Sequence, residues 1–296
     1  MTERVIRDRK PETSALMLRE LNFALVIGLG AFGLGACSTV DTFSSGSRNI
    51  AVVDKSNPDA SVNISSLSDV IKSNPRDPLA YNTRGAAYAR LGQYANAIKD
   101  FSQAIALDPR YAPAYTNRAL AYRQTGNDNA ALGDFTQAIN ADSNYAPAYI
   151  GRANLLRVKG DTAQALADLT QAIRINPESA EAFHARGLVY QKLGQHQEAI
   201  RDFDAAIDRN PFVAAPYDAR GQSMLQVGRY DKALEDFNAT LNVSNTNADA
   251  WAGRGVALEK QGNTREALES YQRAKAIDSN NSVAREGLSR LRKGLF

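Results

Sequence analysis

The sequence nearly lacks cysteine and histidine, the residues on which much metal and redox chemistry depends. Its 296 residues include one cysteine and two histidines. A single cysteine excludes an internal disulfide framework and a multi-cysteine zinc site, and two histidines are too few for a histidine-rich metal centre. Lys and Arg number 35 against 32 Asp and Glu, so no basic excess indicates nucleic-acid binding. We expect no metal and no cofactor.

Long apolar runs are also missing. The apolar stretch 23–34 would cover roughly 18 Å as a helix, which is short of the ~30 Å hydrocarbon core of a bilayer. Basic side chains are spread through the residues before it: Arg4, Arg7, Arg9, Lys10 and Arg19. A basic flank, a short apolar core and small residues at its end are typical of a secretory signal peptide. Residues 1–36 are therefore expected to be a signal, with either Met1 or Met17 as its start.

The signal ends in the letters LGAC at residues 34–37, and its cysteine is the only one in the chain. This tetrapeptide resembles the lipobox of bacterial lipoproteins. The resemblance implies a diacylglycerol on the thiol of Cys37, cleavage before Cys37 and acylation of the new amino group, which together give durable membrane anchoring. Ser38 in the next position favours the outer membrane, with the chain facing the periplasm. The alternative is a plain secretory signal with an incidental cysteine.

Residues 28–33 read GLGAFG and match the letters of the dinucleotide-binding pattern G-x-G-x-x-G. Such a site needs a strand before it, a helix after it and an acidic residue about 20 positions further on. Here basic residues precede the match, the cysteine motif follows it, and glycines are ordinary in signal cores. The match therefore predicts no cofactor site.

From residue 78 the sequence repeats with a period of 34 residues, and five positions keep their register through six copies. An aromatic residue recurs at Tyr81, Tyr115, Tyr149, Phe183, Tyr217 and Trp251. A glycine recurs at Gly92, Gly126, Gly160, Gly194, Gly228 and Gly262. A bulky residue recurs at Phe101, Phe135, Leu169, Phe203, Phe237 and Tyr271. This pattern resembles the tetratricopeptide repeat, which implies an all-α, right-handed solenoid of helix-turn-helix units.

One such unit cannot bury its apolar face alone, so stacked neighbours and caps at both ends are expected. The Ser- and Asn-rich stretch before residue 64 is too polar to form a core and is expected to be a flexible tether. The expected organisation is a signal (1–36), the lipidated cysteine and tether (37–63), a degenerate half-repeat helix (64–77), six repeats (78–281, as 78–111, 112–145, 146–179, 180–213, 214–247 and 248–281) and a capping helix (282–296). The basic side chains of the last helix are expected to face solvent and keep this cap soluble: Arg285, Arg290, Arg292 and Lys293. The alternative is that this basic face binds a membrane or a partner.

One departure from the family consensus is regular. The seventh position, usually leucine, is arginine in every repeat: Arg84, Arg118, Arg152, Arg186, Arg220 and Arg254. The residue before the bulky second-helix position is aspartate in five repeats, at Asp100, Asp134, Asp168, Asp202 and Asp236, and Ser270 in the sixth. Because a partly buried guanidinium needs a carboxylate, we expect a structural Arg–Asp ladder, either inside each repeat or between neighbours. The functional alternative is a basic stripe that binds an acidic ligand.

In this family the first helices line a concave groove, and one ligand mode clamps a carboxylate with basic residues and Asn at the fifth and ninth positions. No basic residue occupies those positions here, so no clamp of that type is expected. The candidate groove residues are Asn82, Arg90, Arg123, Asn154, Arg157, His184, Gln191, Asp218, Gln222 and Glu259. The early part is basic, and Glu181 and Asp249 add to an acidic later part, which Lys192 and Lys260 dilute. This polarity suits an extended peptide or partner helix with the opposite charge order, or it describes an ordinary solvated face.

Catalysis has no support in the sequence, because His184 and His196 are expected on different elements and no nucleophile motif occurs. The chain resembles the tetratricopeptide lipoproteins of the outer membrane. That resemblance implies a membrane-anchored periplasmic scaffold or adaptor that binds protein partners in envelope, pilus or secretion assembly, or in protease targeting. No nucleic acid and no small-molecule substrate are expected. The alternatives are an envelope protein that binds peptidoglycan or another glycan, and a secreted repeat protein without a lipid anchor.

Overall fold

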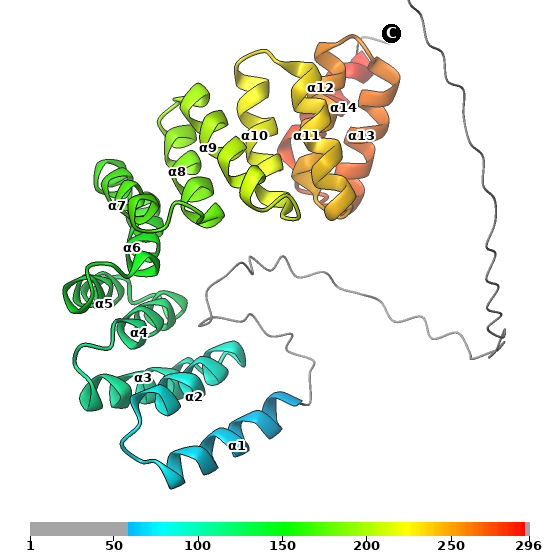
Figure 1. The fold of residues 1–296 in the computed structure, drawn as a ribbon. Coiled ribbons are helices and arrows are strands. Elements are labelled where there is room, and N and C mark those ends of the chain that lie inside the picture. The colour runs from blue at the N-terminus through cyan, green and yellow to red at the C-terminus, as the bar shows by residue number, and fades with distance from the viewer. Residues whose placement is uncertain (1–58, 294–296) are drawn as a thin grey trace, which may run out of the picture. The chain divides into compact units, whose positions relative to one another are not determined.

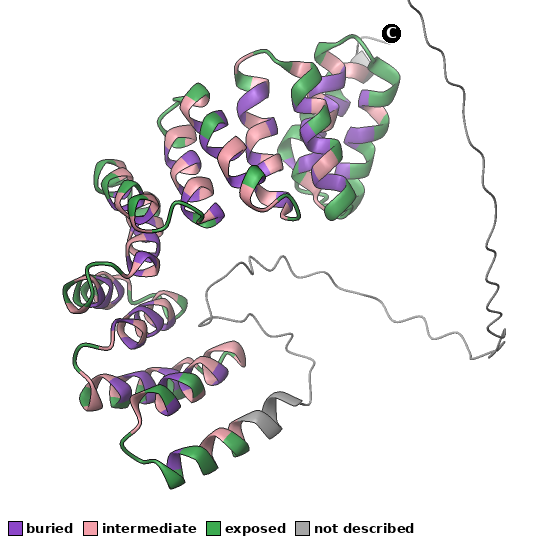
Figure 2. Ribbon diagram, viewed as in Figure 1, coloured by how far each residue is buried: buried purple, intermediate pink, exposed green. Residues whose placement is uncertain are grey.

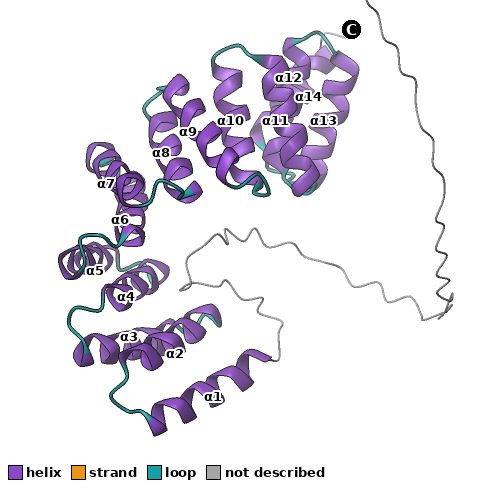
Figure 3. Cartoon of the chain, in the orientation of Figure 1, coloured by secondary structure: helices purple, strands orange, loops and turns teal. Residues whose placement is uncertain are grey.

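A computed structural model describes residues 59–293, which lie within one unit of the chain and contain fourteen α-helices and no strand (Figure 3). The six first helices of the repeats are α2 (Pro78–Arg90), α4 (Ala112–Gln124), α6 (Ala146–Lys159), α8 (Ala180–Lys192), α10 (Ala214–Gln226) and α12 (Ala248–Lys260). The six second helices are α3 (Tyr94–Leu107), α5 (Asp128–Ala141), α7 (Thr162–Ile175), α9 (His196–Arg209), α11 (Tyr230–Val243) and α13 (Thr264–Ile277). The all-α solenoid predicted from the sequence is confirmed.

The turn between the two helices of a repeat is made by the recurring glycine. Gly160 ends α6 with a φ of 92°, a left-handed conformation that glycine adopts without steric cost. The equivalent glycines of the other five repeats also have positive φ. Polar side chains begin several helices: Asp77 accepts from the amide of Leu79, and Asn247 accepts from the amide of Ala250. The sequence thus fixes the helix boundaries through local turns and caps.

The core of each repeat is built around one large side chain from its second helix. Phe101, Phe135, Phe203, Phe237 and Tyr271 are fully buried, and Leu169 takes the same place in the third repeat. In the fourth repeat Gly187 of α8 lies directly against the Phe203 ring, which leaves no room there for a side chain. Small residues on the first helix therefore let the two helices approach closely. Buried residues recur on helices throughout the stack, interspersed with half-buried and exposed ones (Figure 2).

The helices contact one another in chain order and form a curved stack (Figure 1). Each second helix contacts the first helix of its own repeat and the first helix of the next repeat. Successive first helices also contact one another, whereas successive second helices do not within the described residues. The first helices therefore line the inner face of the stack, and the second helices line its outer side.

Two further helices cover the ends of the stack. The helix α1 (Asp59–Ser73) contacts α2 and buries Ile71, and it begins before residue 64, where the half-repeat was expected to start. The helix α14 (Ser282–Lys293) buries Ala284 and Leu288 in a cluster with Tyr271. Both helices give an end repeat the neighbour that it needs to bury its apolar face.

Candidate functional site: the arginine ladder and the inner face

The recurring arginines and aspartates meet inside each of the first five repeats. The Nε and Nη2 atoms of the arginine donate to the two carboxylate oxygens of the aspartate, at 2.6–2.9 Å. The pairs are Arg84–Asp100, Arg118–Asp134, Arg152–Asp168, Arg186–Asp202 and Arg220–Asp236. This two-bond geometry is the strongest arrangement available to a guanidinium and a carboxylate.

The same arginines also reach back to the preceding second helix. The Nη1 atoms of Arg84, Arg118 and Arg152 donate to Ser68, Ser102 and Thr136, at 2.9–3.2 Å. In the fifth repeat, Nη1 of Arg220 lies 2.6 Å from Oδ1 of Asp204. The ladder arginines therefore form hydrogen bonds both inside their own repeat and with the neighbouring repeat. The sequence alone had not decided between these two arrangements.

Aromatic side chains enclose several of these guanidinium groups. The Arg118 guanidinium lies 5.8 Å from the ring centre of Tyr115 and 5.9 Å from that of Tyr122. The hydrogen bond to Asp134 raises the pKa of Arg118 above its ordinary value, although burial acts in the opposite direction. Because its donors are taken up within the chain, the ladder in these repeats is part of the packing rather than a free basic stripe.

The ladder changes in the sixth repeat. Ser270 stands in place of the aspartate, and Nη1 of Arg254 lies 2.5 Å from its hydroxyl oxygen. Nε of Arg254 donates to the Asn238 side chain at 2.9 Å, and the nearest carboxylate is that of the exposed Glu266, at 3.7 Å. Arg254 is thus the one ladder arginine of the six without a bidentate aspartate.

The candidate groove residues lie on the first helices, but they differ in how accessible they are. Asn82 is buried and accepts a hydrogen bond from the side chain of Asn117 in the next repeat. Asn154 and Gln222 are half-buried on the inner face. Gln191 donates to the Ala219 carbonyl and to Ser223 Oγ, both at 3.1 Å. Asn82 and Gln191 therefore join neighbouring repeats; Asn82 is buried, and Gln191 is half-buried.

The early part of the inner face carries three half-buried arginines on successive first helices: Arg90, Arg123 and Arg157. The Nε atoms of Arg90 and Arg157 are buried and have no hydrogen-bond partner among the described residues. Burial lowers the pKa of Arg157, and the nearby charge of Arg123 lowers it further. None of these three arginines forms an ion pair with another residue in the part of the chain that the structure describes.

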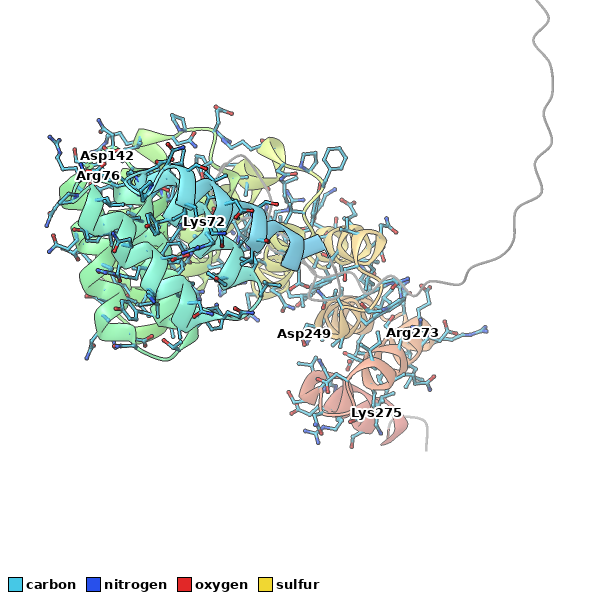
Figure 4. The ribbon with its side chains drawn as sticks, turned by 90° about the horizontal axis from the view of Figure 1, so that it is seen from below. Lys72, Arg76, Asp142, Asp249, Arg273 and Lys275 are labelled. Carbon is cyan, nitrogen blue, oxygen red and sulfur yellow. The ribbon has the colours of Figure 1, made fainter. Side chains whose placement is uncertain are left out.

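The later part of the inner face carries acidic residues. Asp218 is half-buried, and its Oδ1 atom has no hydrogen-bond partner among the described residues. Burial raises the pKa of Asp218 to about 6, and the charge of Asp249 contributes. Asp249 accepts a hydrogen bond of 2.8 Å from Asn281 (Figure 4 labels Asp249). Between the two parts, burial and then Arg157 lower the pKa of His184 to about 4, which keeps its ring neutral at pH 7.

One expected groove residue has a different role. The carboxylate of Glu259 accepts hydrogen bonds from Nε and Nη2 of Arg290 on α14, at 2.6 and 2.8 Å, and from the Tyr271 hydroxyl at 2.7 Å. Glu259 therefore pairs α12 with the last helix, α14, instead of lining the groove. Arg290 is exposed as expected, with 56% of its side chain accessible, and it is also paired with Glu259, which was not expected. The spacing of the repeat could not show this contact, because α14 lies outside the periodic pattern.

We expect the Asp218→Asn variant to be more stable than the unmodified chain at about pH 8, by about 3 kcal/mol. The raised pKa means that the folded chain binds this proton more tightly than the unfolded chain does. Folding stability therefore decreases as pH rises from about 4 through 6, and asparagine removes this loss. Urea denaturation of both proteins at pH 4 and 8 measures the difference, and a difference that does not grow with pH would contradict the assignment.

The described residues hold no candidate metal site and no candidate membrane span. No group of three or more His, Cys, Asp or Glu side chains between residues 59 and 293 is placed to hold a metal ion. His184 lies on α8 and His196 begins α9. No helix in the same range is both long enough and apolar enough to span a bilayer. The signal sequence, its glycine pattern and Cys37 lie outside the described residues.

Family models match most of the repeat region. Models described as "Tetratricopeptide repeat" match residues 78–111, 112–145, 180–212 and 219–282, and one described as "TPR repeat" matches residues 153–194. All of these models describe repeats rather than a catalytic domain. No curated protein matches the chain in a sequence search.

Several solved structures share the fold. A chain of the APC/C hetero-tetramer Cut9-Hcn1 aligns with a TM-score of 0.69 and 18% identity over 80% of this chain, but over only 46% of its own length. PilW, described as a widely conserved type IV pilus biogenesis factor, aligns with a TM-score of 0.61 and 17% identity over 79% of this chain and all of its own. YrrB, described as a TPR protein with an unusual peptide-binding site, aligns with a TM-score of 0.53 and 27% identity over 63% of this chain and 96% of its own. The chain belongs to the tetratricopeptide-repeat family, whose members are generally scaffolds for protein–protein interaction.

Proposed function

We propose that this protein is a membrane-anchored scaffold of the bacterial periplasm whose inner face binds an extended segment of a partner protein. The observation that carries the proposal is the charge order of that face. Arg90, Arg123 and Arg157 lie on the first three repeats, and Asp218 and Asp249 lie on the last two. A segment with the opposite charge order would satisfy both ends at once.

The unpartnered polar atoms on this face support binding of a ligand. Buried polar groups in folded proteins are nearly always hydrogen-bonded, and leaving one unpaired costs about 1–3 kcal/mol. The Nε atoms of Arg90 and Arg157 are buried donors without a partner, and Oδ1 of Asp218 is a buried acceptor without one. Acidic and basic side chains of a bound segment would offset these costs.

The relatives support a scaffold in general terms. YrrB carries a peptide-binding site by its description and shares 27% identity with this chain. PilW is a pilus biogenesis factor by its description, but at 17% identity the likeness concerns the fold alone. Within this proposal, the scaffold would act in pilus or secretion assembly or in protease targeting.

The anchor is proposed to be a lipid on Cys37, with the outer membrane favoured over the inner one. We expect a fatty-acid analogue to label the full chain in growing bacteria and to leave the Cys37→Ser variant unlabelled. Gel fluorescence of the purified proteins measures the label. Equal labelling of both proteins would refute the anchor and leave a secreted repeat protein.

Affinity capture from envelope extract tests the scaffold role, with purified cell-wall sacculi as a parallel bait. We expect the chain without residues 1–36 to retain specific proteins and to leave sacculi unbound. The recurring aromatic side chains of the second helices are fully buried and offer no surface for a sugar ring, whereas those of the first helices are half-buried. Binding to sacculi without any protein partner would replace the scaffold with the glycan-binding alternative.

A further inference from the structure

A hollow of about 560 Å³ opens on the outer side of the stack, between the second helices α11 and α13. Its lining includes Asn238 and Asn242 of α11, Trp251 and Arg254 of α12, and Ser270 and Arg273 of α13. It lies between the fifth and sixth repeats, beside the position where the sixth repeat has lost its ladder aspartate. The inner face is made by the first helices, so this hollow is a separate surface.

The guanidinium of Arg254 is the polar centre of the hollow. Its side chain is 22% exposed, close to the 18–21% of the other ladder arginines. Those arginines face an aspartate whose side chain is 3–10% exposed. Arg254 has only hydroxyl and amide partners and the well-solvated Glu266. The Arg254 guanidinium is thus as desolvated as the other ladder guanidinium groups, but it lacks the close carboxylate that balances the charge in those five repeats.

The neighbouring groups favour an anion. Arg273 is exposed, and no ion pair of its side chain is found among the described residues (Figure 4 labels it on α13). Glu269, the acidic residue of the lining, lies 3.5 Å from Arg265. The side chains of Asn238 and Asn242 add amide groups. Trp251 and Leu241 supply an apolar wall beside these polar groups.

We propose that this hollow binds an acidic side chain of a partner protein, an aspartate or glutamate that supplies Arg254 with the carboxylate its repeat lacks. Because Nε already donates to Asn238 and Nη1 to Ser270, the carboxylate would approach the guanidinium at Nη2. The adjoining wall accommodates an apolar neighbour of that acidic residue. A charge-assisted hydrogen bond from a planar guanidinium gives such a pair both strength and orientation. That the partner is a protein rests on the proposed scaffold function. The hollow would be a second binding surface, separate from the inner face.

Trp251 makes the test specific, because it is the only tryptophan of the chain and it lines the hollow. The probe is the capped peptide acetyl-Leu-Asp-Leu-amide, titrated while the indole N–H resonance of Trp251 is followed by NMR. We expect a saturable shift with this peptide. The matched peptide with asparagine, and free acetate at the same concentration, should leave the resonance in place. An equal shift with the asparagine peptide would show that the hollow does not recognise a carboxylate and would overturn the proposal. An equal shift with acetate would show that it binds any carboxylate rather than a protein segment and would also overturn it.

Two variants complete the test. Ser270→Asp restores the ladder carboxylate, so we expect it to weaken the peptide at least about tenfold while Ser270→Ala keeps the affinity. Arg273→Gln, at an exposed position, should weaken binding several-fold without changing the thermal midpoint. Unchanged affinity in both Ser270→Asp and Arg273→Gln would overturn the proposal. Substitutions on the inner face should leave this titration unaltered. A failure of peptide binding in the hollow can therefore be distinguished from a failure of the proposed scaffold function.

Discussion

Replacing Asp168 and Asp202 together with asparagine should lower the free energy of unfolding by about 6 kcal/mol, about 3 kcal/mol for each pair. Their side chains are 3% and 8% exposed, and each holds an arginine with two hydrogen bonds. Asparagine keeps the shape of the side chain but leaves the guanidinium of Arg152 or Arg186 without its counter-charge. Such a loss in a chain of this size lowers the thermal midpoint by on the order of 10–20 °C.

The matched control for this pair is Asp69→Asn with Asp208→Asn, which removes the same charge from two exposed positions. Exposed charges contribute about 0–1 kcal/mol each, so the control should unfold close to the unmodified chain. Thermal unfolding followed by circular dichroism compares the three proteins. Coincident curves for the double variant and the unmodified chain would show that the ladder does not stabilise the fold.

Phe203→Ala should be the most disruptive single change in the core, at about 3–5 kcal/mol. The ring is fully buried between α8 and α9, so alanine would leave a cavity in the middle of the stack. Because each repeat is stabilised through its neighbours, the loss should spread to the adjoining repeats. Urea denaturation measures the change, and a loss under about 1 kcal/mol would contradict the packing described here.

Gly187 tests the same contact from the opposite side. A Cβ atom on Gly187 would lie 2.5 Å from Cε1 and 2.8 Å from Cδ1 of Phe203, so Gly187→Ala should cost about 1–3 kcal/mol. Gly133 on α5 is exposed and has no atom within 4 Å of the equivalent position, so Gly133→Ala should stabilise the chain by about 0.5–1 kcal/mol. Opposite signs for the two variants are expected, and stabilisation by both would refute the close packing.

The periodic part of the structure was open to prediction because each feature recurs six times. The helix pairs and the glycine turns follow from positions repeated every 34 residues. The approach of Arg118 to Asp134 follows from the same register, since both residues lie on facing helices of one repeat. The bond from Arg118 back to Ser102 was not foreseen, although its spacing of 16 residues also recurs.

Features that depend on contacts outside the repeat were not predictable. Glu259 was assigned to the groove by its position in the repeat, but its partner Arg290 lies on α14, where no periodicity applies. Asn82 was also assigned by position, and the close approach of α2 and α4 buries it against Asn117. The hollow beside Arg254 requires three helices to come together, although the change to Ser270 is visible in the sequence.

The central claim is that the charged inner face binds a protein segment, and a charge-matched comparison tests it most directly. One variant carries Arg90→Gln, Arg123→Gln and Arg157→Gln on the inner face. The control carries Arg110→Gln, Arg174→Gln and Arg201→Gln at exposed positions off that face. Quantitative affinity capture from envelope extract should show partners that bind the unmodified chain and the control but are lost from the inner-face variant. Identical sets of captured proteins for both variants would contradict the claim.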